Sequence, residues 1–443
     1  MEQKDYLELS EDGKTVISCQ KDYQGAMVIP AGVTRIRGRA FANCNGLTSI
    51  EIPSSVTVIG ESAFFYCENL TSIEIPDSVT AIGWGAFYGC TSLTSITIPD
   101  SVTKIGSRAF YNCTSLSSVV ISNRVTVIDD STFEECANLT SIEIPNSVTV
   151  IGVAAFFNTG LTSIEIPDRV TEIGLDAFAA CDNLTSIKLS KSVSEIDYCA
   201  FSGCDSLKEI NVDEGNPKYC SKDGVLYSKD MSILVAVPGS RESIEIPDSV
   251  TVIRDSAFWG CTSLTSVKIP DSVTKIENLA FKCCISLTSI VIPDSVTVIG
   301  GGVFNDCTSL KEIIVEEGNP NYCSEDGVLY SKDMSILVAV PACKDSFVIP
   351  KSVIKIDEEA FASCENLTSI EIPDNVTEIN RSAFDGCDNL TEIHFKRMTP
   401  IVISDSTLIC RDISDFTLYV PKGSGEAYRN SEYYKDFKEI IEE

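Results

Sequence analysis

A short pattern of apolar and polar residues recurs along most of this chain. One copy reads Leu47-Thr-Ser-Ile50-Glu-Ile52-Pro53, in which two isoleucines alternate with polar residues. This alternation is typical of a strand with one buried face, and proline ends the strand because it offers no donor to the ladder. A Ser-Val-Thr-x-Ile segment then predicts a second inward-facing pair. An Ala-Phe-x-x-Cys segment predicts a short helical or 3₁₀ turn back to the next strand.

The pattern repeats with a nearly constant period of about 23 residues. The proline or serine that closes its first strand stands at Pro30, Pro53, Pro76, Pro99, Ser122, Pro145, Pro167, Ser190, Pro247, Pro270, Pro293, Pro350 and Pro373. A fixed period of this length predicts a solenoid, in which each coil buries its apolar face against its neighbours. We therefore expect one continuous body, α/β in class but rich in β.

The array divides the chain into a solenoid with two caps. The solenoid is expected over 29–395, with a hairpin cap at 1–28 and a strand–helix cap at 396–443. Two inserts, 211–243 and 314–346, interrupt the period, and their closely similar sequences indicate duplication of a block of coils. Each insert contains two short strand patterns behind an Asp-Gly turn. A hairpin packed on the solenoid wall is preferred, and a protruding arm is the alternative.

The chain is strongly acidic, with 34 Lys and Arg against 64 Asp and Glu and a formal net charge of -30. Such a field repels phosphate backbones and anionic lipid surfaces, so we expect no nucleic-acid partner. No run approaches the about 18 apolar residues that span a bilayer, so no membrane insertion is expected. The N-terminus lacks a basic region followed by an apolar run, which favours a cytoplasmic protein if Met1 is the native start.

Cysteine is the first candidate for chemistry, because the chain has 19 of them. Twelve share one position of the repeat: Cys44, Cys67, Cys90, Cys113, Cys136, Cys181, Cys204, Cys261, Cys284, Cys307, Cys364 and Cys387. Stacked coils point these side chains in parallel, so the pattern predicts buried, reduced thiols that pack as small apolar residues. There is no Cys-x-x-Cys pair and His394 is the only histidine, so no metal, cofactor or catalytic site is expected.

Candidate partner-binding residues are departures from the consensus at outward-facing positions. Between the two strand isoleucines most copies carry a polar residue, whereas Val291, Ile314 and Val348 make an apolar run. Aligned outward apolar residues form a contact patch. Two alternatives stay open: β-branched residues simply suit a strand, or the second insert covers them.

A second candidate column consists of aromatic residues that follow the core phenylalanine. Its members are Phe65, Tyr88, Tyr111, Phe157 and Trp259. Exposed flat rings suit contact with protein or sugar, because they bring a large area at a small entropic cost. The alternative is that these rings shield the turns beneath them from water.

The full pattern, Leu-x-x-Ile-x-Ile-Pro, Ser-Val-Thr-x-Ile and Ala-Phe-x-x-Cys, resembles the BspA-like leucine-rich repeat family of bacteria. The closing Leu418-Tyr-Val-Pro421 and the Asp-Gly-Val-Leu-Tyr-Ser-Lys-Asp of both inserts are similar to segments of its members. The resemblance covers nearly the whole chain. It implies a leucine-rich repeat solenoid without enzymatic activity and, in some members, adhesion at the cell surface. A secreted or surface location follows if a leader was trimmed.

We therefore expect a non-enzymatic scaffold for protein binding or adhesion. Its expected partner is a host or bacterial surface protein or a glycoconjugate, recognised by exposed columns of a monomer. One alternative is a structural or self-associating repeat protein, and another is a carbohydrate-binding surface protein.

Overall fold

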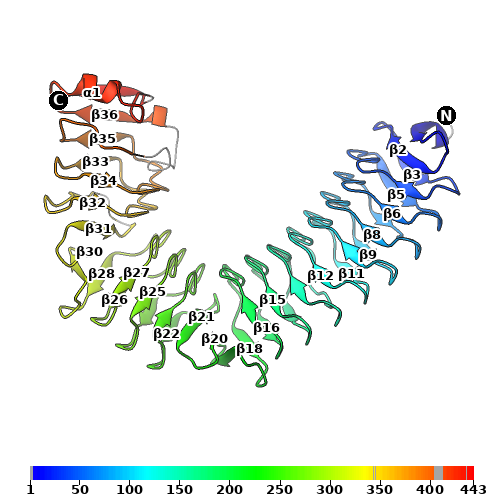
Figure 1. The fold of residues 1–443 in the computed structure, drawn as a ribbon, viewed down its shortest axis with the longest axis horizontal. Helices are drawn as coiled ribbons and strands as arrows, with labels where there is room; N and C mark the ends of the chain where they lie inside the picture. Colours follow the sequence, from blue (N-terminus) through cyan, green and yellow to red (C-terminus); the bar gives the residue numbers. More distant parts are fainter. Residues whose placement is uncertain (1–2, 343, 345, 404–412, 436) are drawn as a thin grey trace. The chain divides into compact units, whose positions relative to one another are not determined.

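The computed structural model describes residues 3–342, 344, 346–403, 413–435 and 437–443. Residues 404–412, which belong to the expected C-terminal cap, and residues 343 and 345 of the second insert lie outside the described part. The structure falls into two compact units, Met1–Asp230 and Met231–Glu443, so the expected array is divided between them. Each unit is a stack of coils, and strands of successive coils lie side by side within it (Figure 1).

In the first unit, every regular coil contributes up to two short strands to two parallel columns. The first column carries the Ile-x-Ile motif and comprises β3 (Gly25–Val28), β5 (Leu47–Glu51), β7 (Ser72–Ile73), β9 (Ser95–Thr97), β11 (Ser118–Val120), β14 (Ser163–Glu165), β16 (Ser186–Leu189) and β18 (Glu209–Val212). The second comprises β4 (Arg35–Ile36), β6 (Val58–Ile59), β8 (Ala81–Ile82), β10 (Lys104–Ile105), β12 (Val127–Ile128), β13 (Val150–Ile151), β15 (Glu172–Ile173) and β17 (Glu195–Ile196). Equivalent isoleucines face each other, as Ile59 and Ile82 do.

The second unit repeats this plan. Its first column comprises β22 (Ser243–Glu245), β24 (Ser266–Lys268), β26 (Ser289–Ile292), β28 (Glu312–Val315), β33 (Ser369–Ile372), β35 (Glu392–Phe395), β36 (Thr417–Val420) and β37 (Glu439–Glu442). Its second comprises β21 (Ile233–Ala236), β23 (Val252–Ile253), β25 (Lys275–Ile276), β27 (Val298–Ile299), β31 (Ile336–Ala339), β32 (Lys355–Ile356) and β34 (Glu378–Ile379). Near the C-terminus lie the 3₁₀ segment η2 (Ile413–Asp415) and the short helix α1 (Gly425–Arg429).

Antiparallel hairpins occur at the start of the chain and in both inserts. The chain begins with the 3₁₀ segment η1 (Gln3–Tyr6) and the pair β1 (Leu7–Leu9) and β2 (Thr15–Cys19). The first insert contains the pair β19 (Tyr219–Lys222) and β20 (Val225–Ser228). In the second, β29 (Tyr322–Glu325) pairs with β30 (Val328–Ser331), and β31 returns to the parallel column beside β32. Hydrogen bonds from Ile313 N to Gly327 O (2.9 Å) and from Val315 N to Ser324 Oγ (3.0 Å) place that hairpin against β28.

The segment that returns each coil to the next strand is a series of turns. This corrects the expectation of a short helical or 3₁₀ turn at that place. In one coil Ser62 and Tyr66 both have φ of 52°, in the left-handed region. The backbone therefore alternates: Phe65 N donates within its own coil to Ser62 O, whereas Phe64 N and Tyr66 N donate to the following coil. A helix would keep all of these amides inside one coil, and the turns release half of them to join the stack.

The core runs between the two strand columns and is built from ladders of identical residues. The phenylalanine rings of successive coils stack, with Phe110 centred 5.3 Å from Phe87 and 5.5 Å from Phe133. All three are fully buried. Threonine hydroxyls add support at the surface, as Thr80 Oγ1 donates to Thr57 O at 3.3 Å. Each coil thus depends on its neighbours for both apolar burial and hydrogen bonds.

Candidate partner-binding surface

The cysteine ladder is structural. The 17 described cysteines are all free thiols, and the twelve ladder members are all buried. Nine of these thiols donate to the carbonyl of the phenylalanine one coil earlier, as Cys90 Sγ does to Phe64 O at 3.2 Å and Cys113 Sγ to Phe87 O at 3.2 Å. The expectation of a reduced, buried ladder is confirmed. In the short repeat Thr159 takes this place and its Oγ1 donates to Phe156 O at 3.0 Å.

Burial raises the pKa of Cys90 and of Cys136 to about 12, so these thiols stay protonated at neutral pH. We expect iodoacetamide at pH 8 to leave the ladder unmodified in the native protein, while Cys220, Cys283 and Cys323, the partly exposed thiols among the described cysteines, react before it. Peptide mapping by mass spectrometry before and after unfolding measures this. Rapid native labelling of the ladder would contradict it.

The single histidine lies on the first strand column of the second unit. The His394 ring stacks on Tyr419 with centroids 4.2 Å apart, and its Nδ1 lies 3.2 Å from a carboxylate oxygen of Glu443. Among the described residues, no serine or cysteine side chain hydrogen-bonds to this imidazole. The contacts of His394 among the described residues are therefore a stacked tyrosine ring and nearby carboxylates.

The apolar candidates of the second unit sit on strands β26 and β28. Val291 and Ile314 lie directly opposite each other in the parallel ladder. Val291 is 44% exposed to solvent and Ile314 is 40% exposed. Their neighbours along each strand, Ile290 and Ile313, are buried. We call Val291 and Ile314 the aliphatic pair. Val348 is more exposed, at 81%, and lies outside any strand after the second insert.

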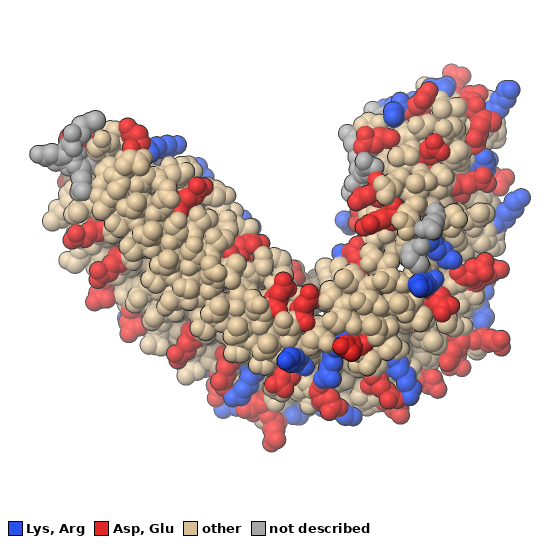
Figure 2. Space-filling model, turned by 180° about the vertical axis from the view of Figure 1, so that it is seen from behind, with Lys and Arg blue, Asp and Glu red and all other residues tan. Residues whose placement is uncertain are grey.

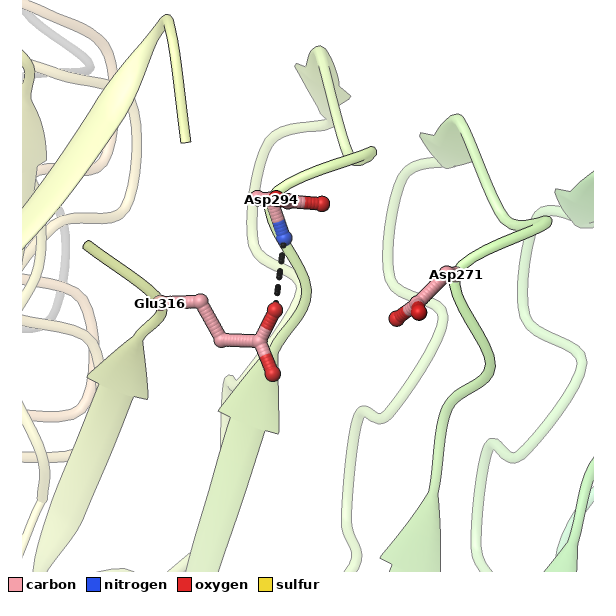
Figure 3. Close-up of side chains that lie close together, drawn as sticks. All are labelled: Asp271, Asp294 and Glu316. Carbon is pink, nitrogen blue, oxygen red and sulfur yellow. Dashed lines mark hydrogen bonds between the residues drawn. The ribbon is translucent and has the colours of Figure 1, made fainter. Parts of the chain in front are cut away.

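Three carboxylates converge beside the aliphatic pair. Asp271, Asp294 and Glu316 come from three adjacent coils, and Figure 3 shows them in the loops at the ends of their strands. One oxygen of each lies within 4.8 Å of the others, all three residues are exposed, and Glu316 Oε2 accepts a bond from Asp294 N at 3.1 Å. We call these residues the carboxylate trio. Sequence reasoning missed it, although aspartate follows proline in many copies.

The aromatic candidates are half-buried, and Phe65, Tyr88 and Tyr111 stack on one another. In the first unit Tyr88 lies 4.8 Å from Phe65 and 4.5 Å from Tyr111, measured between ring centroids. Phe157 is also half-buried, further along that unit. In the second unit Trp259 lies under the ammonium group of Lys282, 4.6 Å from the ring centroid. Stacking turns ring edges rather than ring faces toward water at Tyr88.

Shallow acidic grooves follow the first strand column of the first unit. One, of about 710 Å³, is bordered by Glu51, Glu74 and Asp77. Another, of about 600 Å³, is bordered by Glu143 and by Glu165, whose carboxylate binds Lys188 at 2.5 Å. On the face drawn in Figure 2, acidic side chains gather along the margin of this unit and few charges occupy its middle. In the part of the chain that the structure describes, no helix is long and apolar enough to cross a bilayer.

Comparison with known proteins places the chain in a family. A family model described as a BspA type leucine rich repeat region matches residues 20–139, 126–223, 239–328 and 343–433. The chain therefore belongs to the BspA-type leucine-rich repeat family, and the resemblance noted in the sequence is confirmed. No protein with a curated description matches it.

Solved structures that are similar to this chain include two bacterial leucine-rich repeat proteins. A leucine rich cell surface protein from Faecalibacterium prausnitzii A2-165 is 32% identical, with a TM-score of 0.52 over 88% of this chain and 92% of the other. A leucine-rich repeat protein from Bacteroides ovatus ATCC 8483 is 27% identical, with a TM-score of 0.47 over 88% of this chain and 91% of the other. The fold is that of a leucine-rich repeat scaffold.

Proposed function

We propose that this protein is a non-enzymatic scaffold that binds a macromolecular partner, a surface protein of a host or bacterial cell, through the first strand column of its second unit. The observation that carries the proposal is the aliphatic pair, Val291 and Ile314, which lie side by side at a position where most coils carry a charged or polar residue. Solvent-exposed, adjoining aliphatic side chains gain free energy when a partner covers them. Stacked coils provide such a surface without a pocket.

A surface location is part of the proposal. It is supported by the 32% identical relative, whose name describes a cell surface protein. The aromatic column is a weaker candidate for contact, because Phe65, Tyr88 and Tyr111 already pack their rings against one another. Val348 belongs to the proposed surface as its most exposed aliphatic residue.

The test replaces Val291 and Ile314 together with lysine. We expect the fluorescently labelled double variant to bind epithelial or bacterial cells at least about fivefold less than the wild type, measured by flow cytometry, because two buried contacts become two desolvated charges. Circular dichroism and thermal unfolding establish that the variant is folded.

The matched control carries the same change of charge on the first unit. Val28 and Val120 are 47% and 55% exposed on strands of the first column there, and V28K/V120K should bind like the wild type. Equal binding by the wild type and a folded V291K/I314K protein would remove the aliphatic pair as the contact surface. An equal loss in both double variants would indicate a general effect of charge.

A further inference from the structure

The aliphatic pair lies on β26 and β28, and the carboxylate trio lies in the loops that follow β24, β26 and β28. Along β24, β26 and β28 the outward-facing residues are Lys268, Val291 and Ile314, and the trio follows two or three residues later, as Asp271, Asp294 and Glu316. Lys268 already binds Glu245 on its other side. The surface therefore presents two aliphatic side chains next to three negative charges.

The duplicated block in the first unit shows what this arrangement replaces. The two copies are offset by 103 residues, so Lys188 and Asn211 stand where the second block has the aliphatic pair. They lie opposite each other in the same parallel register, on β16 and β18. In the first block this surface is polar.

The carboxylate trio has a counterpart that contains its own cation. Asp168, Lys191 and Asp213 stand where the second block has Asp271, Asp294 and Glu316. Lys191 Nζ lies 3.0 Å from Asp168 Oδ2, and both Asp168 and Asp213 raise the pKa of Lys191. The first block thus pairs its carboxylates with an ammonium group of the chain. The second block has aspartate at that position, and among the described residues no lysine or arginine pairs with its trio.

We propose that the second block receives a lysine or arginine side chain of a protein partner, on an extended segment whose neighbouring apolar side chain covers Val291 and Ile314. Three carboxylate oxygens within 4.8 Å of one another match the several donors of an ammonium or guanidinium group. Exposed ion pairs alone bind weakly, and the adjoining aliphatic contact supplies the remaining affinity. This inference names the chemistry of the partner and rests on the proposed function.

A basic peptide suits this surface better than a divalent cation does. All three carboxylates are exposed, and one Glu316 oxygen is already engaged by the Asp294 amide. A calcium ion is coordinated by six to eight oxygens, whereas only three acidic side chains of the described residues come together here. A calcium ion also leaves the aliphatic pair uncovered.

The test uses three labelled hexapeptides of alternating Leu-Lys, Ser-Lys and Leu-Glu residues, with binding measured by fluorescence anisotropy at low salt. We expect the Leu-Lys probe to bind the wild type at least about tenfold more tightly than either other probe. Asp294→Lys gives the second block the charge that the first block has at this position. We expect it to weaken binding of the Leu-Lys probe about tenfold. The charge-matched control, Glu172→Lys, changes an exposed carboxylate of the first unit and should weaken binding of the Leu-Lys probe less than about twofold.

A transplant keeps the proposal falsifiable if Asp294→Lys fails to fold. The triple variant K188V/N211I/K191D gives the first block an aliphatic pair and a third carboxylate beside Asp168 and Asp213, and we expect it to bind two Leu-Lys probes per chain instead of one. A stoichiometry that stays at one overturns the proposal.

Other outcomes also decide the matter. Equal binding of Ser-Lys and Leu-Lys probes overturns the role of the aliphatic pair. Calorimetric binding of CaCl₂ to the wild type, lost in Asp294→Lys, together with no peptide binding, would make the trio a metal site instead. If the peptide results hold but V291K/I314K binds cells normally, the peptide site stands and the proposed adhesive surface fails.

Discussion

Replacing Phe110 with alanine is expected to lower the free energy of unfolding by about 3–5 kcal/mol, because the ring is fully buried between two others. Truncation leaves a cavity in the middle of the phenylalanine stack, and the rings of Phe87 and Phe133 each lose a stacking partner. The backbone bonds of the coil hold the neighbouring coils at their spacing, so the gap does not collapse. Urea unfolding followed by circular dichroism measures the loss.

Hydrogen exchange gives this prediction spatial resolution. In a stacked array each coil contacts only its neighbours, so protection should fall in the coils of Phe87, Phe110 and Phe133 and stay unchanged in those of Phe258 and Phe281. The control is Tyr111→Ala, the adjacent half-buried ring, with an expected cost of about 1 kcal/mol. Equal costs for Phe110 and Tyr111 would show that the stack carries no special share of the stability.

The strands and the ladders follow from the sequence because their signals are periodic. The alternation around Ile50 and Ile52 fixes which strand face is buried, and the spacing of the cysteines fixes their alignment. Neither inference requires knowledge of distant contacts. The same regularity made the aliphatic pair visible, since Val291 and Ile314 are adjacent apolar residues at a position that is polar in most coils.

The return turns were predicted wrongly because the Ala-Phe-x-x-Cys spacing also fits one helical turn. The deciding fact is that alternate amides bond to the next coil, which requires left-handed residues at two positions. Those positions hold Gly85 and Gly89 in one coil but Ser62 and Tyr66 in the coil before it. Glycine at the second of these positions in four copies, Gly89, Gly203, Gly260 and Gly386, was the available signal.

The carboxylate trio was missed for a different reason. Aspartate follows the proline in many coils, so Asp271 and Asp294 each look like ordinary solvated residues. Glu316 lies at the start of the second insert, where the repeat pattern is interrupted and no longer shows which residues of neighbouring coils align. Only the stack brings the three together, and comparison of the two duplicated blocks, with Lys191 in place of Asp294, is the sequence signal that points to them.

A second large loss of stability is expected from a substitution in the segment that holds Glu316. Replacing Asn319 with alanine is expected to lower the free energy of unfolding of the second unit by about 3–4 kcal/mol. Asn319 is fully buried, and its Nδ2 donates to Pro293 O and Val296 O, both at 2.8 Å. Its Oδ1 accepts from Asn321 N at 2.9 Å and Tyr322 N at 2.8 Å. Alanine leaves two carbonyls and two amides without these partners.

Thermal unfolding measures this loss, and two further variants define its cause. Asn321→Ala, which removes one exposed bond to Thr297 O, should cost less than about 1 kcal/mol. Asn319→Asp keeps the acceptor and loses the donor, so it should be more stable near about pH 4 than at neutral pH, where an ionised carboxylate faces two carbonyls. A pH-independent loss, or an Asn319→Ala protein as stable as the wild type, would contradict this account. Asn319 holds the insert against the coil of Pro293 through its hydrogen bonds. Its loss should therefore displace Glu316 from Asp294 and weaken binding of the Leu-Lys probe.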